Sequence, residues 1–292
     1  MGGPYRCIGR RVRRMTWRNS VCMLTGRVVC PDANTLVSPL VGPSKSAIDE
    51  FYASTNATLT KIDPAFLANY GDDIAGLLFV GLISSTENYF RDILGFILST
   101  CPVAQAHAAD EKVQLGSLLW AENELQNRAA FEFLPFSSAA SVRSAVTKFC
   151  NYQIKKNGTF DLMLMEFDKL CELRHAIVHS AHIVAGKNAI KLNLKKSSQA
   201  LKVRIRYPEL QASGSVCTSL VQAANNELFE AIVTRWARDW RNLPSWQPSN
   251  EASMLRSIRA GFLSTRDNDN NAIPNRQPVR SLKAKIRTDF NL

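Results

Sequence analysis

The strongest constraint on the fold is a helical repeat of apolar side chains between residues 72 and 98. Its members recur three and four residues apart and are Ile74, Leu77, Leu78, Leu82, Tyr89, Phe90, Ile93, Leu94 and Ile97. This spacing places them together on an α-helix, and Asp72 or Asp73 is a suitable N-cap. Pro102 follows shortly after the last member, where a helix of this kind usually ends. The segment therefore predicts one long, largely buried helix.

Weaker repeats of the same period predict further helices around it. They cover residues 44–59, 113–132, 138–152, 159–174 and 215–240. Between the last two, apolar residues alternate with polar ones at Ile190, Leu192 and Leu194, and again at Leu201, Val203, Ile205 and Tyr207. Alternation is typical of a half-exposed β-hairpin. We therefore expect an all-α bundle decorated by one small hairpin.

Charge separates this body from the ends of the chain. The 292 residues carry a formal net charge of +11, but residues 1–30 hold seven Arg and no acid, and residues 251–292 hold eight basic and four acidic residues. Residues 31–250 are therefore neutral. We predict a basic N-terminal leader over residues 1–43, a helical domain over 44–243 and a basic disordered tail over 244–292. The leader faintly resembles a transit peptide, and translation starting at Met15 or Met23 is an alternative.

Composition also bears on location and on metal binding. The most apolar region has 13 residues without a charge, from Ile74 to Thr86, and a bilayer span needs roughly 18. The seven Cys are scattered, with no Cys-x-x-Cys pair and no Cys/His spacing for a zinc site. Reduced thiols are the simplest interpretation. The expectation is a cytoplasmic protein with no membrane segment, no bound metal and no cofactor.

The segment most suggestive of chemistry follows the predicted helix 159–174. Three of the four His, at positions 175, 179 and 182, fall within eight residues and directly follow Arg174. His175 and His179 are four residues apart and share a helical face. Arg174 and His179 are five apart, about 140° around an ideal helix. Either the helix is distorted here, or a second copy of the chain completes the site.

The string from Arg174 to His179 resembles the Arg, polar, three residues, His signature of HEPN domains (higher eukaryotes and prokaryotes nucleotide-binding), especially the RiboL-PSP-HEPN group. The segment from Glu87 to Leu94 resembles the acidic, aromatic and basic helix earlier in such domains. The resemblance covers roughly residues 72–240. It implies an up-and-down helical bundle, a homodimer and a metal-independent endoribonuclease. A toxin or antiviral defence effector, with an antitoxin or sensor protein as partner, is likewise implied by the resemblance alone.

The roles follow from what RNA cleavage without metal requires: removal of the 2′-OH proton, stabilisation of the charged phosphorane and protonation of the 5′-oxygen. Imidazole transfers protons near neutral pH, and guanidinium offers a fork for two phosphate oxygens. We predict His179 as general base or acid and Arg174 as the phosphate clamp. His175 would orient the phosphate or His179, and Glu87 would orient Arg174. The products would be a cyclic or 3′-phosphate and a 5′-OH.

A basic segment follows the motif immediately. Its seven cations, with no acid among them, are Lys187, Lys191, Lys195, Lys196, Lys202, Arg204 and Arg206. On an exposed hairpin they would contact the phosphates of RNA independently of sequence. A solvated edge that resists aggregation is the alternative.

Other interpretations of the motif remain open. Arg174 and His179 could be a structural ion-pair partner and a core histidine, and His182 could simply end a helix. Glu172 with the three His could ligate a metal. Glu87 could form only a surface pair with Arg91, four residues on. The alternative function is a non-catalytic HEPN-type module that binds RNA or a nucleotide, or that mediates dimerisation.

Overall fold

A computed structural model describes residues 29–38, 45–120, 126–269 and 278–292. The chain divides into two units, Met1–Gly42 and Pro43–Leu292. In the described part of the first unit, a short 3-10 helix (η2, Ala33–Thr35) is capped by Asp32, whose carboxylate accepts a hydrogen bond from the backbone N–H of Asn34. The rest of the predicted leader lies outside the described residues.

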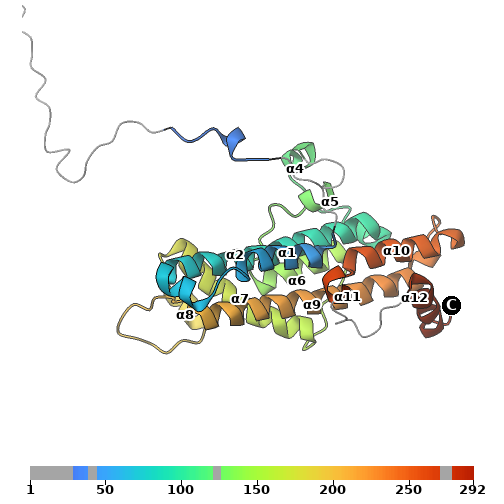
Figure 1. Cartoon of the computed structure of the whole chain (residues 1–292). Coiled ribbons are helices and arrows are strands. Elements are labelled where there is room, and N and C mark those ends of the chain that lie inside the picture. Colours follow the sequence, from blue (N-terminus) through green and yellow to red (C-terminus); the bar gives the residue numbers. More distant parts are fainter. Residues whose placement is uncertain (1–28, 39–44, 121–125, 270–277) are drawn as a thin grey trace, which may run out of the picture. The chain divides into compact units, whose positions relative to one another are not determined.

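The second unit is built on three long helices, which confirms the all-α prediction. They are α2 (Pro64–Thr100), α7 (Thr159–His179) and α9 (Tyr207–Arg238), and they pack along one another (Figure 1). The first helix, α1 (Ala47–Leu59), packs on α2 and α9, and α6 (Ala139–Cys150) packs on α2 and α7. Large aromatic side chains fill the shared core, including Phe79, Phe90, Phe160 and Trp236, each fully buried.

The predicted long helix is present as the second part of α2. Asp63 caps the first part, its carboxylate accepting from the backbone N–H of Phe66 at 2.7 Å. Gly71 then breaks the helix with a φ of 80°, a value that glycine adopts without strain. From there to Thr100 the apolar repeat is buried or half-buried, except for Leu77, which is 65% exposed. The predicted end of this helix is therefore confirmed, and its predicted start at Asp72 or Asp73 directly follows the break at Gly71.

Several helix boundaries differ from the prediction. The helix expected over 113–132 is replaced by α4 (Leu115–Trp120) and α5 (Gln126–Ala129), with 121–125 outside the described residues. A short helix, α3 (Pro102–His107), precedes them. Helix α9 begins eight residues before the predicted Ser215, because Pro208 lies in its first turn and Glu209 accepts from the backbone N–H of Arg206 at 3.1 Å.

The predicted hairpin is not confirmed, because the described residues contain no strand. Its first half lies in and just after a short helix, α8 (Gly186–Lys191), where Ile190 is 82% exposed. Asn188 anchors this helix by donating from its side chain to the carbonyl of Glu172 at 3.2 Å. The second half is extended and makes one isolated antiparallel bridge, between Ile183 and Lys202.

The prediction of a disordered tail was wrong, because most of residues 244–292 form helices. These are η4 (Pro248–Asn250), α10 (Glu251–Phe262), α11 (Thr265–Asp269) and α12 (Val279–Asp289), after η3 (Trp240–Asn242). Leu255, Ile258 and Phe262 of α10 recur three and four residues apart and are buried in the core. The sequence-based prediction missed this short apolar repeat because the residues around it are mostly basic and polar. Residues 270–277 lie outside the described residues.

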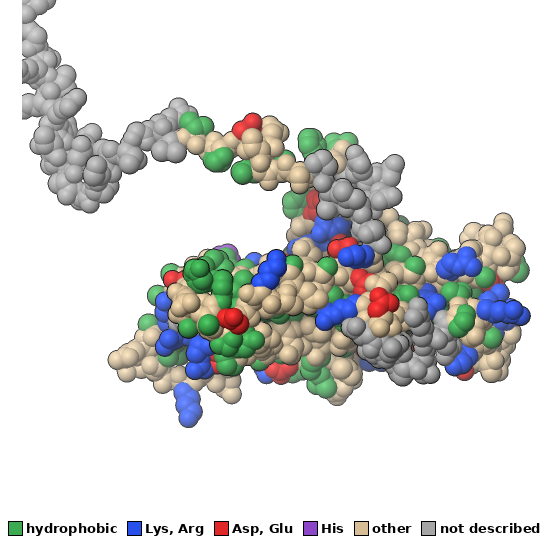
Figure 2. Space-filling model, viewed as in Figure 1, with side chains coloured by type: hydrophobic (Ala, Val, Ile, Leu, Met, Phe, Trp, Pro, Cys, Tyr) green, Lys and Arg blue, Asp and Glu red, His purple; other side chains and the backbone are tan. Residues whose placement is uncertain are grey.

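A buried carboxylate joins these C-terminal helices. Glu251 is 2% exposed. Its carboxylate oxygens lie 2.6 Å from a guanidinium nitrogen of Arg241, 2.8 Å from Nζ of Lys283 and 3.2 Å from a guanidinium nitrogen of Arg287. Burial alone would raise the pKa of Glu251, but Lys283, Arg241 and Arg287 together hold it below its ordinary value. Figure 2 shows Lys and Arg side chains gathered at the end of the molecule where α10 and α12 lie. Part of the expected basic tail therefore neutralises an internal charge.

No single helix in the described parts of the chain is long and apolar enough to cross a membrane; the two parts of α2 meet both requirements only when taken together, and they are bent by 120°.

We predict that Glu251→Gln lowers the free energy of unfolding by about 2 kcal/mol at pH 7, because three cations lose their common partner. A carboxylate whose pKa is lowered by folding stabilises the fold above its unfolded pKa, and this contribution is lost as the pH falls. The difference between parent and variant should therefore shrink below about pH 4. Urea unfolding followed by tryptophan fluorescence measures both quantities.

The matched control is Glu166→Gln, which removes an exposed pair with Lys169 at 2.7 Å. Its effect should stay below about 0.5 kcal/mol. Equal effects of the two substitutions would contradict a stabilising role for the buried cluster.

Candidate functional site

The Arg and His residues of the motif lie on the last two turns of α7, which is continuous to His179. The buried stripe of this helix runs through Phe160, Leu164, Phe167 and Cys171, four, three and four residues apart. Arg174 is the next member of this series, three residues on. A cation therefore occupies a position where the pattern calls for an apolar side chain.

Arg174 is accordingly half-buried. Its Nε is enclosed and has no hydrogen-bond partner among the described residues. The guanidinium lies close enough to the Cys171 thiol to affect its ionisation: burial raises the pKa of Cys171 most, Glu87 raises it further, and Arg174 lowers it. The raised pKa keeps the Cys171 thiol protonated at neutral pH.

His175 and His179 lie on the neighbouring stripe of α7 and are exposed. Their ring centroids are 4.8 Å apart, with 49° between the ring planes. Because the helix is continuous, Arg174 and His179 leave it about 140° apart. Of the two arrangements that the spacing allowed, a distorted helix is therefore not the one observed.

Glu87 does not pair directly with Arg174. It is 9% exposed, and its Oε2 lies 3.4 Å from Arg91 on the next turn of α2. Its Oε1 is enclosed without a partner among the described residues. The expected orienting contact with Arg174 is thus replaced by an ion pair within α2.

His182 forms part of the turn that ends α7. Ala181 and His182 have positive φ values, and the backbone N–H of His182 donates to the carbonyl of Ala176 at 3.0 Å. Its Nε2 lies 3.7 Å from Asp73 of α2. The ring packs against Gly76, where an added Cβ would lie 2.8 Å from Cε1. The structure therefore gives His182 a packing role at a helix junction.

The metal-ligating alternative has no support in the geometry. Among the described residues, no group of three or more His, Cys, Asp or Glu side chains is placed to hold a metal ion. Glu172 instead forms an ion pair with Lys191 of α8, while His182 is turned toward Asp73.

The seven cations of the basic segment are all exposed. Lys191 forms an ion pair with Glu172, and Arg206 forms one with Glu209. Within the described ranges, no ion pair is formed by Lys187, Lys195, Lys196 or Lys202. These four ammonium groups follow the motif and are available to an external anion.

An apolar cavity of about 480 Å³ lies beside the motif. Phe79 of α2, Leu173 of α7 and Val203 of the extended segment line it. Sequence reasoning missed it, because its walls come from segments far apart in the chain and no local pattern marks them.

The chain matches no protein-family model, no curated protein and no solved structure.

The close approach of the His182 ring to Gly76 should change the effect of an alanine at position 76. At an open position in a helix, replacing glycine with alanine raises the free energy of unfolding by about 1 kcal/mol. Gly81→Ala should show this gain, because nothing lies within 4 Å of its added Cβ. Gly76→Ala should be less stable than Gly81→Ala by about 1–2 kcal/mol, because the His182 ring must move.

In a His182→Ala background the clash is absent, so Gly76→Ala should recover the gain that Gly81→Ala shows. Thermal and urea unfolding of the four proteins in this double-mutant cycle measure the coupling. A zero coupling energy would show that the ring does not rest on Gly76.

Proposed function

We propose that this chain is a metal-independent endoribonuclease of the HEPN type that acts in the cytoplasm as a homodimer. The observation that carries the proposal is the pair of exposed imidazoles of His175 and His179, 4.8 Å apart, at the end of the helix that also holds Arg174. A toxin or defence effector restrained by an antitoxin or sensor protein is the biological setting that we propose with it.

The chemistry uses the three side chains in separate roles. His179 takes the 2′-OH proton or gives a proton to the leaving 5′-oxygen. The Arg174 guanidinium stabilises the charge on the phosphorane through its N–H donors. His175, one turn before His179, holds the phosphate or the second imidazole in position. The 2′-oxygen attacks phosphorus and the bond to the 5′-oxygen breaks, which leaves a 2′,3′-cyclic phosphate and a 5′-OH.

A second copy of the chain is part of the proposal because one copy is incomplete. In a single chain Arg174 is half-buried on the packed stripe, and His179 points to solvent. General acid and general base must also stand on opposite sides of the phosphate, and two rings on adjacent turns of one helix share a side. A two-fold axis at the end of α7 would supply a second His179 from the opposite side.

The alternative function, a non-catalytic module for RNA binding or dimerisation, is favoured by one observation. The Nε of Arg174 is enclosed in the single chain, so this donor is closed to a phosphate. The two proposals differ in whether the motif is needed for cleavage.

We predict that the purified protein cleaves RNA in excess EDTA, and that Arg174→Ala and His179→Ala each reduce the rate at least about 100-fold. Gel analysis of end-labelled RNA measures the rate and identifies the ends. Arg256→Ala and His107→Ala, both exposed and outside the motif, are the matched controls and should retain activity. RNA binding without cleavage in every sample would favour the alternative function.

The His179→Ala variant also tests the composite site. Parent protein refolded with about a tenfold excess of His179→Ala is held mostly in heterodimers, which keep only one His179 in the shared cleft. Because the cleft needs a His179 from each copy, we expect cleavage per parent chain to fall about tenfold. Undiminished cleavage, with heterodimers demonstrated by differently tagged copies, would contradict a site shared across the two-fold axis.

The basic segment predicts a separate effect on binding. Lys195→Ala with Lys196→Ala should weaken binding of a non-cleavable 2′-O-methyl RNA. The slope of log K against log salt should fall by about 1.4, because each lysine that neutralises a single-strand phosphate adds about 0.7 to it. Fluorescence anisotropy at several salt concentrations measures this slope. An unchanged slope would show that these lysines form only a solvated loop.

A further inference from the structure

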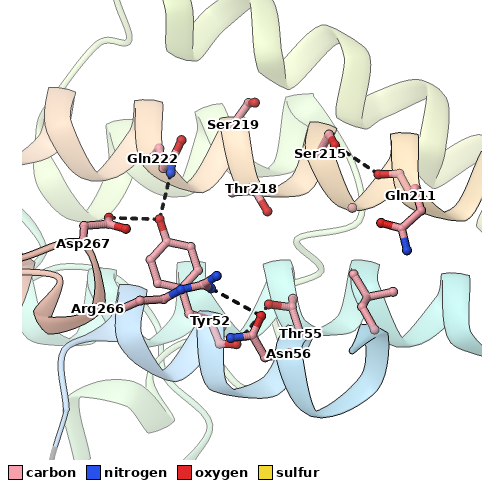
Figure 3. A pocket seen from close by; sticks show the side chains of 12 residues that line it. Tyr52, Thr55, Asn56, Gln211, Ser215, Thr218, Ser219, Gln222, Arg266 and Asp267 are labelled. Atoms are coloured by element: carbon pink, nitrogen blue, oxygen red, sulfur yellow. Dashed lines mark hydrogen bonds between the residues drawn. The ribbon is translucent and has the colours of Figure 1, made fainter. Parts of the chain in front are cut away.

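A polar groove of about 440 Å³ lies between α1 and α9, and α11 closes one end (Figure 3). It is formed by helices other than α7, so its residues are separate from the motif. Its volume is in the range of small-molecule sites.

The α9 wall of the groove is polar where a bundle helix is usually apolar. Gln211, Ser215, Thr218 and Gln222 recur four, three and four residues apart, and all line the groove. This spacing puts them on one face of the helix. Beside them, Gly214 lets α1 approach: a Cβ on Gly214 would lie 3.1 Å from the Leu59 side chain. Because these residues are polar, this part of the interface between α1 and α9 lacks the apolar burial that would otherwise stabilise it.

The α11 end holds its polar groups in fixed positions. The Tyr52 hydroxyl accepts from the Gln222 amide at 2.8 Å and donates to Asp267 at 3.1 Å. Burial, as the main cause, raises the pKa of Tyr52 to about 12, so this hydroxyl keeps its proton at neutral pH. Arg266 stacks 4.7 Å above the Tyr52 ring and donates to Asn56 at 3.3 Å. Groups oriented before binding lower the entropic cost of holding a ligand.

Hydrogen-bonding capacity remains after these contacts. In the part of the chain that the structure describes, the Asn56 amide N–H₂, the Gln222 amide oxygen and both ends of the Gln211 amide have no side-chain partner. The hydroxyl groups of Thr218 and Ser219 also make no hydrogen bond there. Of these groups, the Thr218 hydroxyl and the Gln211 amide point toward α1, whereas the Ser219 hydroxyl points away from it (Figure 3).

The lining selects the chemical class of the ligand. Arg266 and Asp267 carry opposite charges at the same end of the groove, so neither an anion nor a cation is favoured by net charge. An apolar ligand would desolvate amides and hydroxyls without replacing their hydrogen bonds. Planar amide, carboxylate and guanidinium groups each offer two atoms side by side, which match the two adjacent hydroxyls of a vicinal diol.

We propose that this groove binds the vicinal diol of a small neutral ligand. The diol could belong to a free saccharide or to the ribose of a nucleoside, and the hydrogen-bonding chemistry is the same for both. The proposal does not depend on the ribonuclease activity.

The test titrates the full-length protein with maltose, adenosine and 2′-deoxyadenosine by isothermal calorimetry. Maltose and adenosine carry vicinal diols, and 2′-deoxyadenosine lacks one. Binding of maltose identifies the saccharide source, and binding of adenosine at least about tenfold tighter than its 2′-deoxy analogue identifies the ribose source. No binding of any probe up to about 10 mM overturns the proposal, as does equal binding of the two nucleosides without binding of maltose.

Two variants place the binding in the groove. Ser215→Trp, at an exposed lining position, fills the groove and should abolish the heat of binding. Thr218→Val removes one hydroxyl at nearly constant volume and should weaken binding about 5- to 10-fold. Ser257→Trp, exposed on α10, is the matched control and should bind like the parent. Unchanged affinity in both groove variants, with their helicity retained by circular dichroism, overturns the proposal.

Discussion

The face of α7 that packs against the bundle determines where the side chains of the candidate site point. Four apolar residues from Phe160 to Cys171 bury one stripe of this helix, and the same stripe carries Arg174 into a half-buried position. The helix stays regular, so His175 and His179 must point outward. Burial of this apolar stripe of α7 contributes several kcal/mol to the free energy of unfolding. An exposed histidine contributes far less than this, so the apolar stripe decides which face of α7 is buried. Packing of the bundle therefore separates the guanidinium from the imidazoles within one chain.

The sequence predicted those parts of the fold in which a long apolar repeat meets clear capping residues. The second part of α2 and helix α6, which follows the N-cap Ser138, are of this kind. The predicted hairpin is absent because Ile190 lies at the end of α8, which stops at Lys191, so residues 190–194 include the end of a short helix and the turn after it. The prediction of a disordered tail was wrong because Glu251 pairs with three cations from two other segments, η3 and α12. Such a contact has no local signature in the sequence.

The candidate site could be predicted only in part for the same reason. A short motif identified Arg174 and the two exposed histidines, because their residue types and spacing are local. The contact of His182 with Gly76 and Asp73 joins residues about 100 positions apart, so no window of sequence contains it. The polar groove between α1 and α9 is a mixed case: its α9 stripe is visible in the sequence once the helix is known, whereas Arg266 and Asp267 reach it only through the fold.

In the proposed mechanism, two copies of α7 complete one site for a phosphodiester. The most direct test is a crystal structure of the full-length chain with a 2′-O-methyl RNA, which cannot supply the attacking hydroxyl. We expect a phosphate between the α7 ends of two copies, with His179 of each copy within hydrogen-bond reach, about 3 Å, of the reacting oxygens. RNA bound by a single copy away from His175 and His179, or an assembly that keeps the two α7 ends apart, would contradict it.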